Sequence, residues 1–167
     1  MSSIGCDNPN IRELTFITHD CGNGEPDDVF KDCMKDIFRS YRNLTSLTIK
    51  SERLRWFESW EKASTLKSLT SLHLHTDVIW RTRSLKSYLA SQSTIKTLTY
   101  YKSNTNSKEE NTLVPFLFSS KCNIDNISIN VYFGEPLPLV ERRLRSLTMR
   151  LFHNYQTYTS DMDMVQL

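Results

Sequence analysis

Two histidines, His73 and His75, lie two residues apart in the segment SLHLH, a spacing that could serve metal binding. In an extended strand, residues two apart face the same side, so both imidazoles could contact one metal ion. A metal site needs further ligands, and the sequence offers no identifiable third one. The four cysteines form no Cys-x-x-Cys pair and have no histidine at zinc-finger spacing. We therefore expect free thiols and no metal site.

Motifs for nucleophilic catalysis and nucleotide binding are also incomplete. His19 and His153 have cysteines or acidic residues nearby in the sequence. A nucleophile and its base need a third orienting group and an oxyanion hole, and neither is identifiable here. The segment CGNGEP (residues 21–26) lacks the further glycine and the lysine of a phosphate-binding loop, and it predicts a turn before a helix. We expect no enzyme activity and no cofactor.

Basic and aromatic residues raise the question of nucleic-acid binding. The segment RLRWFESWEKA (residues 53–63) could stack on bases and contact phosphates, but its aromatic residues recur at helical spacing and so predict a buried helix face. The net charge is +2, with 3 basic and 8 acidic residues in 1–36 and 18 basic and 9 acidic residues in 37–150. Such a field could attract an acidic partner or nucleic acid, but charges on solvated helix faces give the same count, and we favour that explanation.

A repeated sequence pattern predicts the strands that position these residues. Six segments follow the pattern apolar-x-x-apolar-x-apolar: IRELTF (11–16), LTSLTI (44–49), LTSLHL (69–74), IKTLTY (95–100), IDNISI (124–129) and LRSLTM (144–149). Their fourth positions are separated by 33, 25, 26, 29 and 20 residues. The last three positions alternate apolar, polar, apolar, which predicts a short strand with one buried face.

The connections between the predicted strands have a different period. Apolar residues recur at helical spacing in residues 27–41, 53–63 and 84–92. The fourth connection contains a polar loop and then Pro115, which fits the first turn of a helix or a kink. The fifth, residues 134–143, leaves room for little more than a turn.

Short strands joined by helical crossovers must lie parallel. A unit of roughly 26 residues cannot bury its apolar face alone and has to stack on its neighbours. The sequence therefore predicts a solenoid with strands inside the curve and helices outside.

The L-x-x-L-x-L pattern resembles the leucine-rich repeat superfamily over about residues 6–150. Units longer than 24 residues, helical outer segments and the lead-ins CDNPNI and KCNI resemble the ribonuclease-inhibitor-like class, particularly the irregular repeats downstream of F-box motifs. The resemblance implies an α/β fold: a right-handed leucine-rich-repeat-like solenoid, or partial horseshoe, with short parallel strands on the concave face and helices on the convex face. We expect residues 1–150 to form one domain of about six irregular repeats, and residues 151–167 to form a poorly defined C-terminal tail.

The chain departs from this family at one position in each unit. The family usually places Asn or Cys three or four residues after the last motif position, where its side chain bonds the neighbouring turn. The positions three beyond hold His19, Glu52, Asp77, Ser103, Tyr132 and Phe152. We therefore expect irregular turns. Because no F-box-like segment precedes the repeats, we expect an adaptor fragment that lacks its F-box.

The polar positions of the predicted strands supply the candidate binding surface. Residues two apart share a face, so two columns of polar side chains should project from the concave sheet. We predict that the binding face consists of Lys50, His73, His75, Thr99, Tyr101, Asn130 and Arg150. Tyr and Arg are enriched where binding energy concentrates. The alternative for these positions is a solvated sheet face.

These observations predict a protein-protein interaction module, specifically the substrate-recognition part of an F-box-type ubiquitin ligase adaptor. We expect another protein as partner, rather than nucleic acid or a membrane. The sequence lacks a signal peptide and an apolar run of membrane-spanning length, so we expect a cytoplasmic or nuclear protein. Two alternatives stay open: a basic solenoid that binds RNA or another polyanion, and a non-functional repeat fragment.

Overall fold

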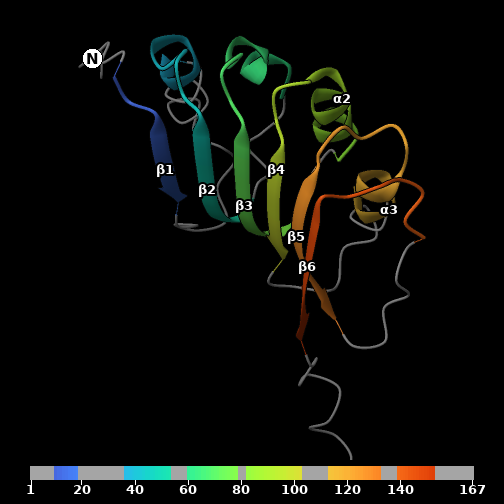
Figure 1. Ribbon diagram of the computed structural model, residues 1–167. Coiled ribbons are helices and arrows are strands. Elements are labelled where there is room, and N and C mark those ends of the chain that lie inside the picture. Colours follow the sequence, from blue (N-terminus) through green and yellow to red (C-terminus); the bar gives the residue numbers. More distant parts are fainter. Residues whose placement is uncertain are drawn as a thin grey trace, which may run out of the picture.

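The protein has an α/β fold with an open, six-stranded, all-parallel sheet. The computed structural model describes residues 10–18, 36–53, 60–78, 82–102, 113–132 and 139–152. The strands are β1 (Glu13–Thr18), β2 (Ser46–Arg53), β3 (Ser71–Val78), β4 (Thr97–Lys102), β5 (Asn126–Tyr132) and β6 (Ser146–Phe152). They lie side by side in chain order, β1 to β6, and each neighbouring pair is parallel (Figure 1). The predicted parallel strands are confirmed.

The register of the sheet aligns the six copies of the repeated phrase. Their fourth positions pair from strand to strand in the order Leu14, Leu47, Leu72, Leu98, Ile127 and Leu147. A slip by one residue would turn every apolar side chain of a strand to the opposite face, so burial of one face fixes this register. The unequal spacings of the copies are therefore absorbed by the connections.

The turns that lead into the strands stack in the same way. The carbonyl of Arg12 accepts hydrogen bonds from the backbone N–H groups of Thr45 and Ser46, at 2.7 and 3.0 Å. The carbonyl at the second position of each later copy, up to Asp125, likewise accepts two N–H groups from the following copy. This arrangement satisfies backbone groups that strand pairing alone would leave open. The six copies are thus equivalent in backbone structure as well as in sequence pattern.

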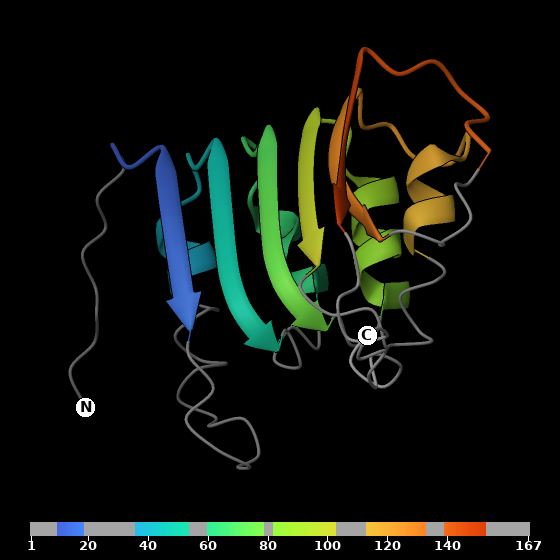
Figure 2. The same cartoon turned by 90° about the horizontal axis from the view of Figure 1, so that it is seen from below.

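The described helices lie on one face of the sheet, as Figures 1 and 2 show from two directions. They are the 3-10 helix η2 (Trp60–Thr65), α2 (Thr82–Ser91) and α3 (Leu113–Phe118), and residues 36–40 are also helical. Pro115 is the third residue of α3, in the first turn, where proline removes no helical hydrogen bond. Among the described residues, no helix has both the length and the apolar character needed to cross a membrane.

The helix observed near residues 53–63 is of a different type from the predicted one. Within residues 53–63 we expected an amphipathic helix, but residues 60–65 form a 3-10 helix and residues 54–59 lie outside the described part. Trp60 and Ala63 are nonetheless buried, as the pattern predicted. A 3-10 turn is common in short connectors, and the described part of this one leaves only a short loop before β3.

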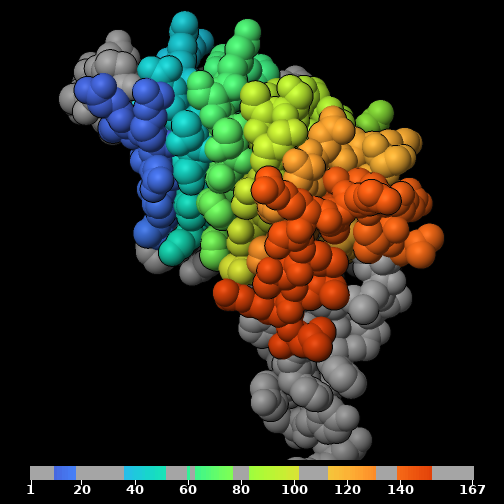
Figure 3. Space-filling view, in the orientation of Figure 1, coloured from blue at the N-terminus to red at the C-terminus, as the bar shows by residue number. Residues whose placement is uncertain are grey.

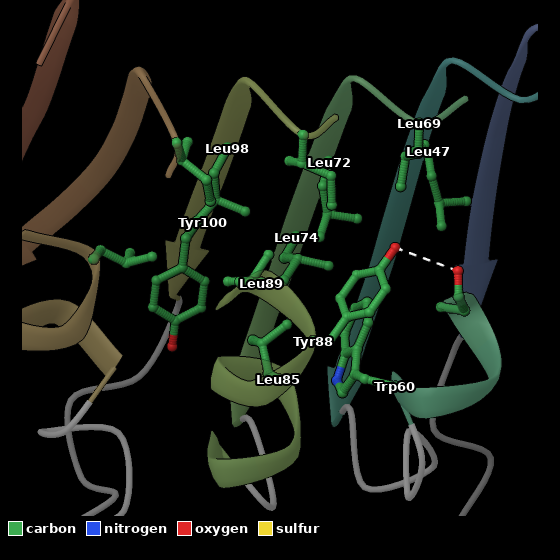
Figure 4. Close-up of a cluster of buried hydrophobic side chains, with 14 of the residues drawn as sticks. Leu47, Trp60, Leu69, Leu72, Leu74, Leu85, Tyr88, Leu89, Leu98 and Tyr100 are labelled. Carbon is green, nitrogen blue, oxygen red and sulfur yellow. Dashed lines mark hydrogen bonds between the residues drawn. The ribbon is translucent and has the colours of Figure 1, made fainter. Parts of the chain in front are cut away.

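The core lies between the sheet and the helices. Figure 4 shows Leu72 and Leu74 of β3 on the sheet side of the cluster and Leu85 and Leu89 of α2 on the helix side; all four are fully buried. Burial of each such side chain contributes about 1.5–3 kcal/mol relative to exposure. These side chains pack β3 against α2.

An aromatic pair joins two connections within this core. The rings of Trp60 and Tyr88 stack with centroids 5.4 Å apart, and the Tyr88 hydroxyl donates a hydrogen bond to the carbonyl of Ala63 at 3.5 Å (Figure 4). Burial raises the pKa of the Tyr88 phenol well above its ordinary value. The pair therefore links η2 to α2, and so the second connection to the third.

The sixth copy differs from the others in burial. Leu47, Leu72 and Leu98 are 0% exposed, whereas the equivalent Leu147 of β6 is 37% exposed and Leu151 is 72% exposed. The described part of the connection to β6, residues 139–145, contains no helix. Strand β6 also continues to Phe152, two residues into the predicted tail; residues 153–167 lie outside the described part. The end of the sheet thus has an incompletely covered apolar face.

An arginine anchors the described part of this connection, residues 139–145. The half-buried Arg142 donates from its guanidinium group to the carbonyl of Leu117, at 3.2 and 3.3 Å, and to the carbonyl of Ile124. The backbone N–H of Glu141 donates to the carbonyl of Phe118 at 3.0 Å. The bonds to Leu117 and Phe118 satisfy carbonyls at the C-terminal end of α3, where the last carbonyls have no partner within the helix. Residues 139–145 are therefore tied to α3 by hydrogen bonds.

Candidate binding surface on the open face of the sheet

On the face of the sheet opposite the helices, here called the open face, the described side chains form three rows. The first row is Glu13, Ser46, Ser71, Thr97, Asn126 and Ser146; the second is Thr15, Thr48, His73, Thr99, Ser128 and Thr148; the third is Ile17, Lys50, His75, Tyr101, Asn130 and Arg150. They alternate with the apolar residues that face the helices. Figure 3 shows β1 to β4 side by side at this surface.

Side chains in the second row bond across the strands. The Nδ1 atom of His73 and the hydroxyl of Thr99 lie 2.9 Å apart, and the hydroxyls of Tyr101 and Ser128 lie 3.1 Å apart. Thr99 and Ser128 thus hold a histidine from β3 and a tyrosine from β4 in fixed positions. Threonine favours strands and can form such cross-strand bonds, so this row contributes to the sheet as well as to its surface.

The third row contains a contact cluster, here called the aromatic-cation cluster, of His75, Tyr101 and Arg150. The rings of His75 and Tyr101 meet edge to face, with centroids 5.0 Å apart and planes at 87°. The guanidinium carbon of Arg150 lies 4.7 Å from the centre of the Tyr101 ring, within the range of a cation–π contact. Because β5 separates β4 from β6, the Arg150 side chain reaches across one strand to make this contact.

Positive charge gathers around this cluster. Burial lowers the pKa of His75, and the positive charges of Lys50, His73 and Arg150 lower it further. Burial also lowers the pKa of His73, although the carboxylate of Glu13 acts in the opposite direction. Across the three rows, all of whose side chains the structure describes, Glu13 on the edge strand β1 is the only carboxylate. Among these described side chains the cations outnumber the carboxylate, so the third row is suited to an anionic group. Glu52 and Asp77 lie two residues further along β2 and β3, with side chains outside the described part.

The structure brings together most of the residues predicted for the binding face. His75, Tyr101 and Arg150 are in contact, and Lys50 lies beside His75 in the register of β2 and β3. His73 and Thr99 form a separate pair in the second row. Asn130 is half-buried and pairs with Arg150 in the register of β5 and β6.

Ser128 is not among the residues predicted for the binding face, yet it makes a contact there. Its hydroxyl holds the hydroxyl of Tyr101. The repeat pattern does indicate that Ser128 lies on the open face, because it occupies the polar position of its repeat. A small residue there does not by itself suggest a role in positioning a tyrosine. The contact between Tyr101 and Arg150 could not be found from register, which places them two strands apart.

Side chains suited to metal binding or nucleophilic chemistry are dispersed in the described part of the chain. No group of three His, Cys, Asp or Glu residues there could hold a metal ion. Cys122 is a free, buried thiol, and burial raises its pKa, which lowers its reactivity. The other three cysteines and the remaining histidines, His19 and His153, lie outside the described residues.

No protein-family model, curated protein or solved structure matches this chain at a significant level.

Proposed function

We propose that the chain is a leucine-rich-repeat-like solenoid that acts as a protein-protein interaction module through its open face. The proposal includes a specific version, in which the chain is the substrate-recognition part of an F-box-type ubiquitin ligase adaptor. Strand order, stacked turns and the position of all described helices on one face support the solenoid.

The observation that carries the binding role is the aromatic-cation cluster. Tyr and Arg are enriched among the residues that dominate interface energies, and here both lie on a sheet face free of described helices. The Tyr101 ring is held by Ser128 and His75, so little freedom remains to be lost on binding. A preorganised aromatic side chain beside a cation is well suited to anchor a partner.

The test compares partner capture by matched variants of the tagged full chain. The face variant combines Lys50→Ala, His75→Ala, Tyr101→Ala and Arg150→Ala. The control combines Lys67→Ala, Arg83→Ala and Lys121→Ala, three exposed positions outside the three rows. Substitutions at exposed positions usually change stability by about 0.5 kcal/mol or less. His75 and Tyr101 are half-buried, so thermal unfolding of each variant checks that it remains folded.

We expect the control to retain a specific partner in quantitative affinity purification and the face variant to lose it. Capture of the same partner by a folded face variant would reject the open face as the binding surface.

A second candidate function is binding of RNA, favoured by the 18 basic against 9 acidic residues in 37–150. It predicts an affinity that falls steeply with salt, because bound phosphates release counterions. The absence of RNA binding at low salt, or an affinity that does not change with salt concentration, would reject this candidate.

A further inference from the structure

The permanent positive charge of the three rows is confined to a narrow line. The first and second rows consist mainly of Ser, Thr and Asn, whereas the third row contains Lys50 and Arg150, both exposed. Between them lie His75 and Tyr101, half-buried and in contact. The first and second rows lie on one side of the third row. A chain bound along the third row, across the strands, would contact the cations and the aromatic ring.

The span of this line sets the size of what can occupy it. Neighbouring strands lie about 4.8 Å apart, so Lys50 on β2 and Arg150 on β6 are separated by about 19 Å along the sheet. An extended peptide rises about 3.3 Å per residue, so about six residues cross this distance. Alternate side chains of such a peptide face the same side, which would direct every second side chain toward the sheet.

We propose that the third row of the open face binds an extended acidic peptide segment of a partner protein, with its Asp or Glu carboxylates at Lys50 and Arg150 and its chain crossing the rings of His75 and Tyr101. This inference rests on the proposed function. Arginine can bind a carboxylate with two parallel hydrogen bonds. The Tyr101 ring orients the guanidinium group, and the Ser128 hydroxyl in turn orients Tyr101.

The observations favour a peptide over a nucleic acid as occupant. Single-stranded nucleic acid is bound by a continuous basic groove together with a series of aromatic platforms. Here the fixed cations of the three rows are Lys50 and Arg150, and Tyr101 is the one large aromatic ring among those described side chains. Two separated cations with a single ring between them match a short segment that carries spaced carboxylates.

Binding of such a segment should be coupled to the protonation of His75. In the free protein, His75 is faced by Lys50 from β2, by His73 from its own strand β3 and by Arg150 from β6, and Tyr101 from β4 lies against its ring. Glu52 and Asp77 follow on β2 and β3, with side chains outside the described part. A bound carboxylate would favour the charged imidazole, so the complex should take up a proton and affinity should rise as the pH falls.

Fluorescence anisotropy with defined peptides tests this proposal on the full chain. The probe is a labelled dodecapeptide of alternating Glu and Ser, and the control peptide replaces every Glu by Gln. We expect the double variant Lys50→Gln/Arg150→Gln to bind the Glu peptide about tenfold more weakly, which corresponds to a loss of about 1.4 kcal/mol. The matched double variant Arg83→Gln/Lys121→Gln removes the same charge from α2 and from the turn after α3, and should leave the affinity nearly unchanged.

A third variant, His75→Gln, tests the protonation step. The unchanged chain should bind the Glu peptide more tightly as the pH falls from about 7.5 to 5.5, the range in which histidine titrates. The variant should lose most of this dependence.

Three results would overturn the proposal: equal losses in the two charge-matched double variants, equal binding of the Glu and Gln peptides, or tighter binding of a uridine dodecamer than of the Glu peptide. If the Glu peptide fails to bind while the face variant still loses its partner, the acidic segment is wrong and the proposed interaction function stands.

Discussion

At the scale of single residues, His73 and His75 make the stability of the fold depend on pH. Burial lowers the pKa of both side chains below the ordinary value of 6.5. Above this value both histidines are neutral in the folded and unfolded states. As the pH falls through 6.5 toward the lower pKa values of the folded state, the unfolded chain takes up protons first, so the free energy of unfolding decreases.

We therefore predict that the variant His73→Gln/His75→Gln loses less stability than the unchanged chain over this pH window. Urea denaturation at a series of pH values measures the difference, and His19 and His153 cancel because both chains contain them. The same slope of stability against pH in the two chains would show that His73 and His75 are not desolvated in the fold.

At the scale of elements, the buried face of each strand carries the stability of its repeat. Leu72 of β3 is fully buried, so Leu72→Ala should reduce the free energy of unfolding by about 2–5 kcal/mol. Leu147 occupies the equivalent position of β6 but is 37% exposed, so Leu147→Ala should cost clearly less. Denaturant unfolding of both variants makes a matched comparison, since the same substitution is made at the same register position. Equal losses would mean that β6 is as well covered as β3.

Most of the sheet could be predicted because the repeated phrase combines strand period with repeat spacing. The alternation in LTSLTI and LTSLHL places Leu47 and Leu72 on the helix side, and helical connections require parallel strands. The 3-10 helix at residues 60–65 could not be predicted, because the apolar spacing of a short connector does not distinguish the two helix types. The exposure of Leu147 could not be predicted either, because LRSLTM matches the buried copies and the burial of a strand depends on which elements cover it.

The candidate site could be predicted as a set of positions but not as a set of contacts. Alternation along the strands selects Lys50, His75, Tyr101 and Arg150 for the open face. The cluster itself depends on the conformation of Arg150, whose side chain crosses β5 to reach a ring two strands away. Sequence spacing carries no information on such a rotamer, so the link between Tyr101 and Arg150 emerges only in three dimensions.

At the scale of the whole molecule, stacking makes each repeat depend on its neighbours. The central strands β2, β3 and β4 each have a neighbour on both sides and a fully buried leucine at the shared register position. The end strands β1 and β6 have one neighbour each; Leu14 and Phe16 are only half-buried, and Met149 is 43% exposed. In a stacked array, stability is approximately a sum over repeats and the interfaces between them, so the end repeats should open at lower cost than the centre.

Amide hydrogen exchange measured by mass spectrometry should reveal this gradient as slow exchange in β3 and faster exchange in β1 and β6. Leu72→Ala should accelerate exchange in the flanking strands β2 and β4 as well as in β3, because the substitution weakens both interfaces of its repeat. Leu147→Ala should accelerate exchange in β6 and leave β2 unchanged, since three strands separate them. Uniform protection across the sheet, or an equal response of β2 to both substitutions, would mean that the chain unfolds as one cooperative unit.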